Sequence, residues 1–383
     1  MDKLTILLSG MVAAVPYQGG ATWAVLQYLR GLRRLGHDVW FIESLAPSAL
    51  QPEGRRLADT DNASYFRTVM RETGTEQAAL LLTGTQETVG ASYAALRDAA
   101  RRADVLLNIA GTLTAGELFH AVPRRAYLDL DPGFTQAWHM LGVDVRLDGH
   151  THYVTVGQAI GHRECLAPTC GISWLSTLPP VVMADWPPAV AIRWDAFTTV
   201  ANWRSYGAIE YEGVTYGQKV HSLRQMIDLP TRTEERFTLA LSIHSAEVRD
   251  LAALTTNEWG IVDPARVVAT PTAYQRFVQG SRAEFGIAKS GYVSSRTGWF
   301  SERSACYLAS GRPVIAQDTG FSRFLPTGSG LFTFRDAAEV LAAVDALRGH
   351  YARHARAARA FAEAHFDSAT VLPRLLERIG AAP

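Results

Sequence analysis

Short apolar runs alternate with amphipathic helical stretches along this chain from its first residues. Residues 4–9 form an apolar run of strand length, residues 21–35 carry apolar side chains on one helical face, and residues 37–43 form the next run. A strand, a helix and a second strand in this order predict a right-handed parallel crossover. Because the pattern recurs through residues 77–130, we expect a doubly wound α/β domain there.

A proline-rich stretch at residues 178–194 interrupts this alternation, which then starts again. At 383 residues the chain is also too long for one ordinary core. We therefore predict an N-terminal domain at 1–185, a linker, a second Rossmann-like domain at 196–365 and a last helix at 366–383 that packs back on the first domain. In the second part, strands are expected at 197–201, 237–243, 283–288, 312–316 and 331–334, and helices at 216–227, 246–254, 272–280, 301–310, 337–347, 350–365 and 368–379.

Composition argues against several functional classes. Lys plus Arg and Asp plus Glu both number 37, so net charge offers no argument for a nucleic-acid or membrane partner. The chain has 3 cysteines without metal-ligand spacing, which favours a reducing cytoplasm over a disulfide framework. We expect a cytoplasmic protein without a membrane span, and the oligomeric state is open.

The stretch 298–320 combines a loop, a helix, a glycine turn, a buried strand and a second glycine loop. Ser301 is placed to cap the helix, and Gly311 ends it. The free N–H groups of a helix N-terminus, together with Ser304 and Arg303, form the kind of site that binds a phosphate or a pyrophosphate. We therefore expect an anionic ligand at the start of this helix.

Four features of the chain resemble GT-B glycosyltransferases, which use nucleotide-activated sugars. Gly19 and Gly20 precede the first helix, and that helix ends in the sequence LRRLGHDV at 32–39. The alternation restarts near Phe197, where the donor-binding domain would begin. The segment from Arg303 to Ile315 is similar to the donor signature, and the loop DTGF at 318–321 follows it.

The resemblance implies two Rossmann-like doubly wound domains, each with a parallel sheet, facing a cleft. It also implies a metal-independent enzyme of the hexosyltransferase type, with no cofactor beyond the nucleotide-diphosphate sugar as co-substrate. The donor would bind mainly the C-terminal domain, and a small-molecule or glycan acceptor the N-terminal domain, with no nucleic acid involved. The residues expected to hold the donor are Gly19, Gly20, Arg204, Lys219, Ser301, Glu302, Arg303, Asp318, Thr319 and Gly320.

The charge of the leaving group supports these assignments independently of the resemblance. Transfer from a nucleotide diphosphate requires stabilisation of the negative charge on the leaving group, which arginine, lysine and helix N-termini supply. Arg303 is the first candidate, and Arg204 and Lys219 follow, since both lie after the first strand of the second domain. A solvated surface charge is an equally plausible interpretation of Arg204 and Lys219.

One position departs from the family pattern. A glutamate that holds the ribose hydroxyls usually stands five residues before the glycine corresponding to Gly311, and here that residue is Cys306. Glu302 is the nearest carboxylate, one helical turn earlier on the same face. Either Glu302 replaces the usual glutamate or the ribose is held in another way.

The candidate catalytic residues are His150, His152 and Asp131. A base that deprotonates an acceptor hydroxyl needs a pKa near neutrality, which favours histidine. His150 and His152 lie two apart before a β-like run, a spacing that also suits metal ligands, but a third ligand is missing and we predict no metal site. Asp131 ends the sequence Asp-Leu-Asp and is expected at the rim of the cleft. For both His150 and His152, an ordinary hydrogen-bonded histidine without a catalytic role is at least as plausible.

Three other functions remain open on the sequence alone. A sugar-nucleotide epimerase of the same fold would need acid and base carboxylates, which Asp131 and Glu302 leave possible. A nicotinamide oxidoreductase is disfavoured because the first strand lacks a G-x-G-x-x-G motif. The replacement of the usual glutamate by Cys306 also fits a non-catalytic sugar-nucleotide-binding protein.

Overall fold

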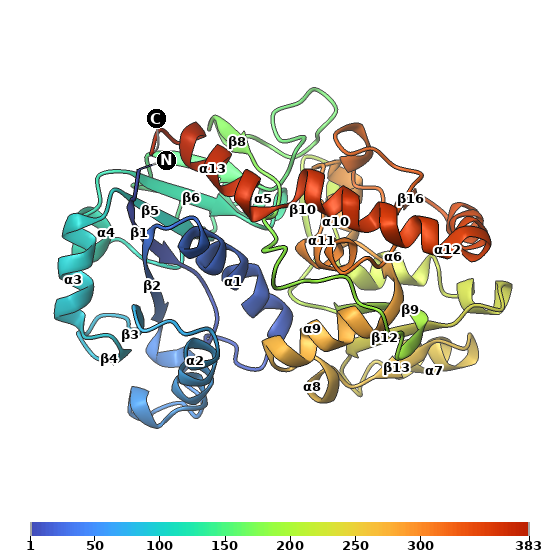
Figure 1. Cartoon of the computed structure of the whole chain (residues 1–383), viewed down its shortest axis with the longest axis horizontal. Helices are drawn as coiled ribbons and strands as arrows, with labels where there is room; N and C mark the ends of the chain where they lie inside the picture. The colour runs from blue at the N-terminus through green and yellow to red at the C-terminus, as the bar shows by residue number, and fades with distance from the viewer. Residues whose placement is uncertain (1, 382–383) are drawn as a thin grey trace.

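The computed structural model describes residues 2–381, which form two α/β domains joined by an extended linker (Figure 1). The N-terminal domain is built on an eight-stranded sheet in the order β4-β3-β2-β1-β5-β6-β7-β8. All of its pairings are parallel except that of β3 with β4. Its strands are β1 (Thr5–Ser9), β2 (Asp38–Leu45), β3 (Ala78–Leu82), β4 (Thr88–Gly90), β5 (Val105–Ile109), β6 (Arg125–Asp129), β7 (His152–Thr155) and β8 (Trp174–Ser176).

The helices of this domain follow the strands as a doubly wound fold requires. Helix α1 begins at Gly19, and the residue after its C-terminal cap is Gly36, whose φ of +90° suits a glycine after a helix. Strand β1 is buried along most of its length because helices cover both faces of the sheet. The helices are α1 (Gly19–Arg34), α2 (Asp61–Glu72), α3 (Tyr93–Arg102), α4 (Glu117–His120) and α5 (Phe134–Met140), with short 3₁₀ turns at Pro47–Ala49 and Leu57–Asp59.

The C-terminal domain has a six-stranded parallel sheet in the order β13-β12-β9-β14-β15-β16. The hairpin of β10 and β11 lies outside this sheet and was not expected from the sequence. The strands are β9 (Trp194–Asn202), β10 (Ile209–Tyr211), β11 (Val214–Tyr216), β12 (Phe237–Ser242), β13 (Gly260–Val262), β14 (Ser281–Gly286), β15 (Val314–Gln317) and β16 (Leu331–Phe334).

The two helices predicted at 337–347 and 350–365 form one long helix, α12, which kinks where His350 leaves helical geometry (φ −144°, ψ 37°). The final helix α13 lies against α1 (Figure 1). At this contact Gly31 of α1 leaves room for the side chain of Leu372. The helices are α6 (Lys219–Arg224), α7 (Val248–Thr256), α8 (Pro264–Val267), α9 (Pro271–Gly280), α10 (Ser290–Ser295), α11 (Glu302–Ala309), α12 (Ala337–His365) and α13 (Ser368–Arg378), with 3₁₀ turns at Leu229–Arg232 and Phe321–Arg323.

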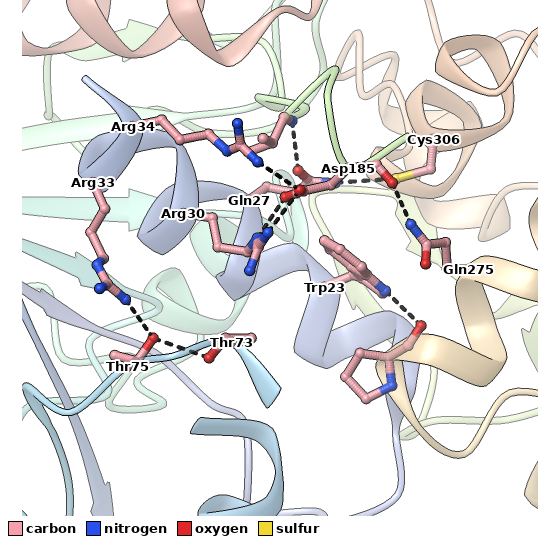
Figure 2. A network of polar contacts seen from close by, with 12 residues as sticks. Trp23, Gln27, Arg30, Arg33, Arg34, Thr73, Thr75, Asp185, Gln275 and Cys306 are labelled. Atoms are coloured by element: carbon pink, nitrogen blue, oxygen red, sulfur yellow. Dashed lines mark hydrogen bonds and ion pairs between the residues drawn. The ribbon is translucent and has the colours of Figure 1, made fainter. Parts of the chain in front are cut away.

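Helix α1 ties the linker and the C-terminal domain to the N-terminal sheet (Figure 2). Asp185 of the linker accepts hydrogen bonds from Arg30 at 2.5 and 2.7 Å and from Arg34 at 3.0 Å. Trp23 donates its indole N–H to the carbonyl of Pro271 in α9 at 2.8 Å. These contacts fix the linker to α1 and α1 to the C-terminal domain, so α1 helps to set the relative position of the two sheets.

A buried carboxylate holds the loop that leads from β1 into α1. Glu43, on β2, is 1% exposed and accepts hydrogen bonds from the backbone N–H groups of Ala13 (2.8 and 2.9 Å) and Ala14 (2.6 Å). Burial raises the pKa of Glu43 to about 7, although the backbone N–H donors oppose that shift. The loop is thereby anchored by a group that titrates near neutral pH.

This gives a pH-dependent prediction. Because the pKa of Glu43 is higher in the folded state than in the unfolded state, stability should fall as pH rises from about 4.5 to about 7 and then level off. The loss should be on the order of 3 kcal/mol. Urea unfolding between pH 5 and 8 should show this slope in the wild type and lose it in Glu43→Gln. The exposed Glu76→Gln is the control, and an unchanged slope in Glu43→Gln would contradict the prediction.

Candidate functional site

A cavity of about 640 Å³ lies between the two domains, and we call it the interdomain hollow. The N-terminal domain contributes the loop after β1, and the C-terminal domain contributes residues at the carboxyl ends of β9, β12 and β13. Parallel α/β sheets commonly bind ligands at this edge. The lining residues are Pro16, Tyr17, Gln18, Gly19, Gly20, Ala21, Val200, Ala201, Asn202, Lys219, Leu241, Ser242, Ile243, Ile261, Asp263, Pro264, Ala265, Val268, Tyr274, Glu302 and Arg303.

Five of the predicted donor-binding residues line this hollow, namely Gly19, Gly20, Lys219, Glu302 and Arg303. Other lining residues were not predicted from the sequence, among them Asn202, Ser242 and Asp263. Asn202 and Ser242 are the last residues of β9 and β12, and Asp263 directly follows β13. Their place at the carboxyl ends of strands is a signal that could have identified them.

Gly19 and Gly20 allow the domains to approach each other closely. A Cβ atom on Gly19 would lie 2.5 Å from the carbonyl oxygen of Val268, and one on Gly20 would lie 2.8 Å from the ring of Tyr274. Both contacts join the start of α1 to the C-terminal domain. These glycines therefore serve the domain contact and also leave the backbone open to the hollow.

Arg303 is committed to an ion pair inside the protein. Its Nε donates to Glu284 Oε1 at 2.6 Å and its Nη1 donates to the carbonyl of Val200 at 3.0 Å. Glu284 is fully buried and Arg303 is 7% exposed. Ser301 Oγ also accepts the backbone N–H of Arg303 at 3.2 Å, so the cap predicted from the sequence occupies one of the free donors of α11. Arg303 forms part of the wall of the hollow, with its charge balanced by Glu284.

Lys219 is the cation of the hollow that has no partner. Its side chain is half-buried, and it makes no hydrogen bond or ion pair with any residue in the described range 2–381. Burial lowers the pKa of Lys219 well below its usual value, and the positive charges of Arg303 and Lys289 lower it further. A nearby anion would favour the charged form of Lys219 and so oppose this lowering, which makes Lys219 a natural contact for phosphate oxygens.

Glu302 and Cys306 lie on the same helix in different surroundings. Glu302 reaches the hollow, whereas Cys306 is 3% exposed and its Sγ accepts a hydrogen bond from Gln27 Nε2 of α1 at 3.5 Å (Figure 2). The other end of the Gln27 amide accepts the backbone N–H of Val182 in the linker at 2.8 Å. Cys306 therefore takes part in the contact between the domains, and Glu302 is the carboxylate of α11 that faces the hollow.

The other predicted donor contacts lie outside the lining of the hollow. Arg204 is 45% exposed and pairs with Glu247. Asp318 pairs with Arg335 at 3.1 Å and accepts the N–H of Gly320 at 2.9 Å, so it fixes its own loop. In that loop Thr319 is 1% exposed and donates its hydroxyl to the carbonyl of Trp299 at 2.5 Å.

The two histidines predicted as catalytic also lie away from the hollow. His150 uses both ring nitrogens, one with Asn108 at 3.0 Å and one with the carbonyl of Leu147 at 3.0 Å. Burial lowers the pKa of His150. His152 begins β7, so it lies at the amino edge of a sheet whose carboxyl edge faces the hollow. Neither has the surroundings of a base in the cleft.

The two aspartates of the Asp-Leu-Asp sequence differ from each other. Asp129 is 1% exposed and accepts hydrogen bonds from Thr135, Gln136 and Thr155 at 2.8 to 2.9 Å. Asp131 reaches across to the C-terminal domain, where Lys289 Nζ donates to it at 3.0 and 3.2 Å. Asp129 thus organises its own domain, while Asp131 joins the two domains.

A second hollow, of about 490 Å³, lies at the carboxyl edge of the N-terminal sheet, and we call it the edge hollow. It is bordered by the ends of β2 and β3 and by the segment after β5, and β2 and β5 flank β1 in the sheet. Its lining includes four polar side chains that make no hydrogen bond with other described residues, and it includes no Lys, Arg or His. These four are Ser44, Thr83, Gln86 and Thr114.

Two absences hold for residues 2–381. In that range no cluster of three or more His, Cys, Asp or Glu side chains is arranged to hold a metal ion. Nor does any helix there combine the length and the apolar character needed to cross a bilayer.

Comparison with known proteins shows a likeness in structure alone. No protein-family model and no curated protein sequence matches the chain. HepE from Anabaena, solved with UDP and glucose, superposes with a TM-score of 0.61 at 12% identity over 99% of this chain and 100% of that one. An alpha-glucosyltransferase solved with UDP-glucose and DNA containing an abasic site gives 0.60 at 11% identity over 98% of both chains.

AviGT4, a glycosyltransferase involved in avilamycin A biosynthesis, gives a TM-score of 0.58 at 14% identity, over 98% of this chain and 97% of that one. These likenesses extend over nearly the whole length of every chain compared. Together with the two parallel sheets they confirm the predicted fold class, since the chain has the GT-B fold of two Rossmann-like domains facing a cleft.

The Arg303–Glu284 pair leads to a prediction about stability. Arg303→Met leaves Glu284 buried without a counter-ion, so we expect a loss of about 3–5 kcal/mol in the free energy of unfolding, measured by urea titration. The double variant Arg303→Met/Glu284→Leu should recover most of that loss. Arg348→Met, which breaks an exposed pair with Glu234, should change stability by about 1 kcal/mol or less. Equal losses of unfolding free energy in Arg303→Met and Arg348→Met would contradict the structural role of Arg303.

Proposed function

We propose that this protein is a glycosyltransferase that moves a hexosyl group from a nucleotide-diphosphate sugar to a hydroxyl of a small-molecule or glycan acceptor. The observation that carries the proposal is Lys219, a cation without a partner among residues 2–381, which faces a cavity between the domains of a GT-B fold. A ligand with a diphosphate supplies the anion that Lys219 lacks. The proteins of similar fold solved with UDP or UDP-glucose support the same class of donor.

The walls of the interdomain hollow fit the remaining parts of such a donor. Apolar side chains at Ile243, Ile261 and Val268 offer a surface for a nucleobase, and Asn202 and Asp263 offer polar groups beside it. Glu302 is the carboxylate placed to bind hydroxyl groups of the ribose or of the sugar. Stabilisation of the leaving diphosphate is assigned to Lys219 and the N-terminal turn of α11, which requires no metal.

The edge hollow supports an uncharged acceptor rich in hydroxyl groups. Ser44, Thr83, Gln86 and Thr114 present free hydrogen-bonding groups there, and its volume lies within the usual range for small-ligand sites. The absence of a cationic lining disfavours a phosphate backbone, in contrast to the DNA seen with the alpha-glucosyltransferase. We therefore propose a glycan or a small polyhydroxylated acceptor and no nucleic acid.

The donor assignment is tested with Lys219→Met. Calorimetric titration with UDP should show an affinity about 10- to 100-fold lower than in the wild type, as expected for the loss of a charge-assisted contact. Arg204→Met, which lies outside the hollow, is the matched control and should bind UDP normally. Equal affinities for UDP in the wild type and Lys219→Met would refute the role of Lys219. Because the proposed site requires no metal, a chelator should leave the affinity of the wild type for UDP unchanged.

Titration of Lys219 adds a second test. Since the pKa of Lys219 is lowered in the free protein and a bound diphosphate raises it, binding of the diphosphate should take up protons. The affinity for the diphosphate should therefore fall as the pH rises above the pKa of Lys219 in the free protein. Calorimetry in buffers of different ionisation enthalpy measures this uptake. No proton uptake at any pH between 6 and 9, with tight binding retained, would show that the diphosphate does not reach Lys219.

The acceptor assignment is tested by turnover. With a donor identified from a panel of nucleotide sugars, Thr83→Val and Gln86→Ala should raise the KM for the acceptor several-fold and leave donor affinity unchanged. Product formation without any acceptor would favour an epimerase instead. A protein that binds UDP yet turns over no donor with any hydroxylated acceptor would favour a non-catalytic binding protein.

A further inference from the structure

A half-buried cluster of charged groups and aromatic rings joins the two domains beside the interdomain hollow. From the N-terminal domain come Asp131 and Phe134, and from the C-terminal domain come Tyr206, Lys289 and Tyr292. Lys289 Nζ donates to both carboxylate oxygens of Asp131, at 3.0 and 3.2 Å. Tyr206 donates its hydroxyl to Asp131 Oδ2 at 2.6 Å, and Tyr292 donates to Oδ1.

Aromatic rings surround the ammonium group of Lys289. It lies 4.4 Å from the ring centre of Tyr206, 4.8 Å from that of Phe134 and 5.3 Å from that of Tyr292. The side chains of Lys289 and Asp131 are only 15% and 28% exposed. A pair so enclosed, with additional hydrogen bonds to its carboxylate, holds its geometry far better than an exposed ion pair does.

The backbones of the two domains also meet closely at this cluster. A Cβ atom on Gly291, in α10, would lie 2.7 Å from Cζ of Phe134, so only glycine permits the approach. Close by, Leu166 donates its N–H to the carbonyl of Ser295 at 2.8 Å. The cluster is therefore part of a tight contact between the domains.

The segment that carries Lys289 is also bonded to the segment that carries Lys219. Gly291 donates its N–H to the carbonyl of Gly217 at 3.0 Å, and Ser290 donates to the carbonyl of Gln218 at 3.4 Å. Helix α6 begins at the next residue, Lys219. A displacement of Lys289 would thus be transmitted directly to the N-terminus of α6.

We propose that Asp131 and Lys289 form a latch that holds the two domains closed and fixes Lys219 in the hollow. Both are positioning residues, because they act through the alignment of other groups. Asp131, predicted from the sequence as a catalytic residue at the rim of the cleft, is here committed to Lys289 and two tyrosines. Loss of either charge leaves the other half-buried without a counter-ion, which weakens the contact and populates open forms.

The latch is tested first without any ligand, so this test is independent of the proposed function. Amide hydrogen exchange should be faster in Asp131→Asn and Lys289→Met than in the wild type, by several-fold, in segments 130–136, 217–222 and 289–296. The matched control is Glu164→Gln, which breaks the exposed ion pair of Glu164 with Arg323 between the same domains and should leave these segments unchanged. Unchanged exchange in both latch variants would overturn the proposal.

The second readout rests on the proposed function. If open forms come to dominate the free protein, the apparent Kd for UDP should rise in proportion, about tenfold when one molecule in ten remains closed. The donor KM should rise with it while kcat changes little. A lower kcat at an unchanged KM would place Asp131 in the chemistry and overturn the latch.

If Asp131→Asn and Lys289→Met unfold globally, neither readout can be interpreted. The double variant Asp131→Leu/Lys289→Leu is then used in their place. Removing both charges avoids a buried unpaired ion, so the double variant should fold. It should still bind UDP more weakly than the wild type, because Lys219 is no longer held in place. Wild-type affinity in a folded double variant would overturn the proposal.

Discussion

The central physical constraint in this structure is a cation without a counter-ion. Of the basic groups around the interdomain hollow, Arg303 is balanced by Glu284 and Lys289 by Asp131, which leaves Lys219 unpaired in the described chain. A half-buried ammonium group in such surroundings is unfavourable unless an anion joins it or its proton leaves. The hollow is thereby prepared for a negatively charged ligand, and the two completed ion pairs keep its walls in place.

The domain contacts explain how this arrangement is maintained. Helix α1 holds the linker through Asp185 and the C-terminal domain through Trp23, and the latch of Asp131 and Lys289 joins the domains again beside the hollow. These contacts come from segments far apart in sequence. In each contact, almost all of the hydrogen-bonding capacity of a polar group is used. Such contacts favour one relative position of the domains over a range of positions.

Much of the fold could be predicted from the sequence because the strands are buried and the helices have clear ends. Apolar runs such as Thr5–Ser9 and Val314–Gln317 are the signals that parallel strands give, and Ser301 and Gly311 mark the ends of α11. The hairpin of β10 and β11 was missed because its strands are only three residues long. In the site, Lys219 was found by its place at a helix start after the first strand of the second domain, and Glu302 as the carboxylate nearest to Cys306 on the same helix. The partners of Arg303, Asp131 and Cys306 lie 19, 158 and 279 residues away, and no local pattern indicates such pairings.

The proposed role of the interdomain hollow therefore depends on where an anionic ligand binds relative to Lys219. A crystal structure of the protein with UDP measures this most directly. We predict electron density for the diphosphate in the interdomain hollow, with an oxygen within hydrogen-bonding distance of Lys219 Nζ and with the Arg303–Glu284 pair intact. A UDP molecule bound elsewhere, or one whose diphosphate contacts Arg303 after that pair has broken while Lys219 remains free, would contradict it.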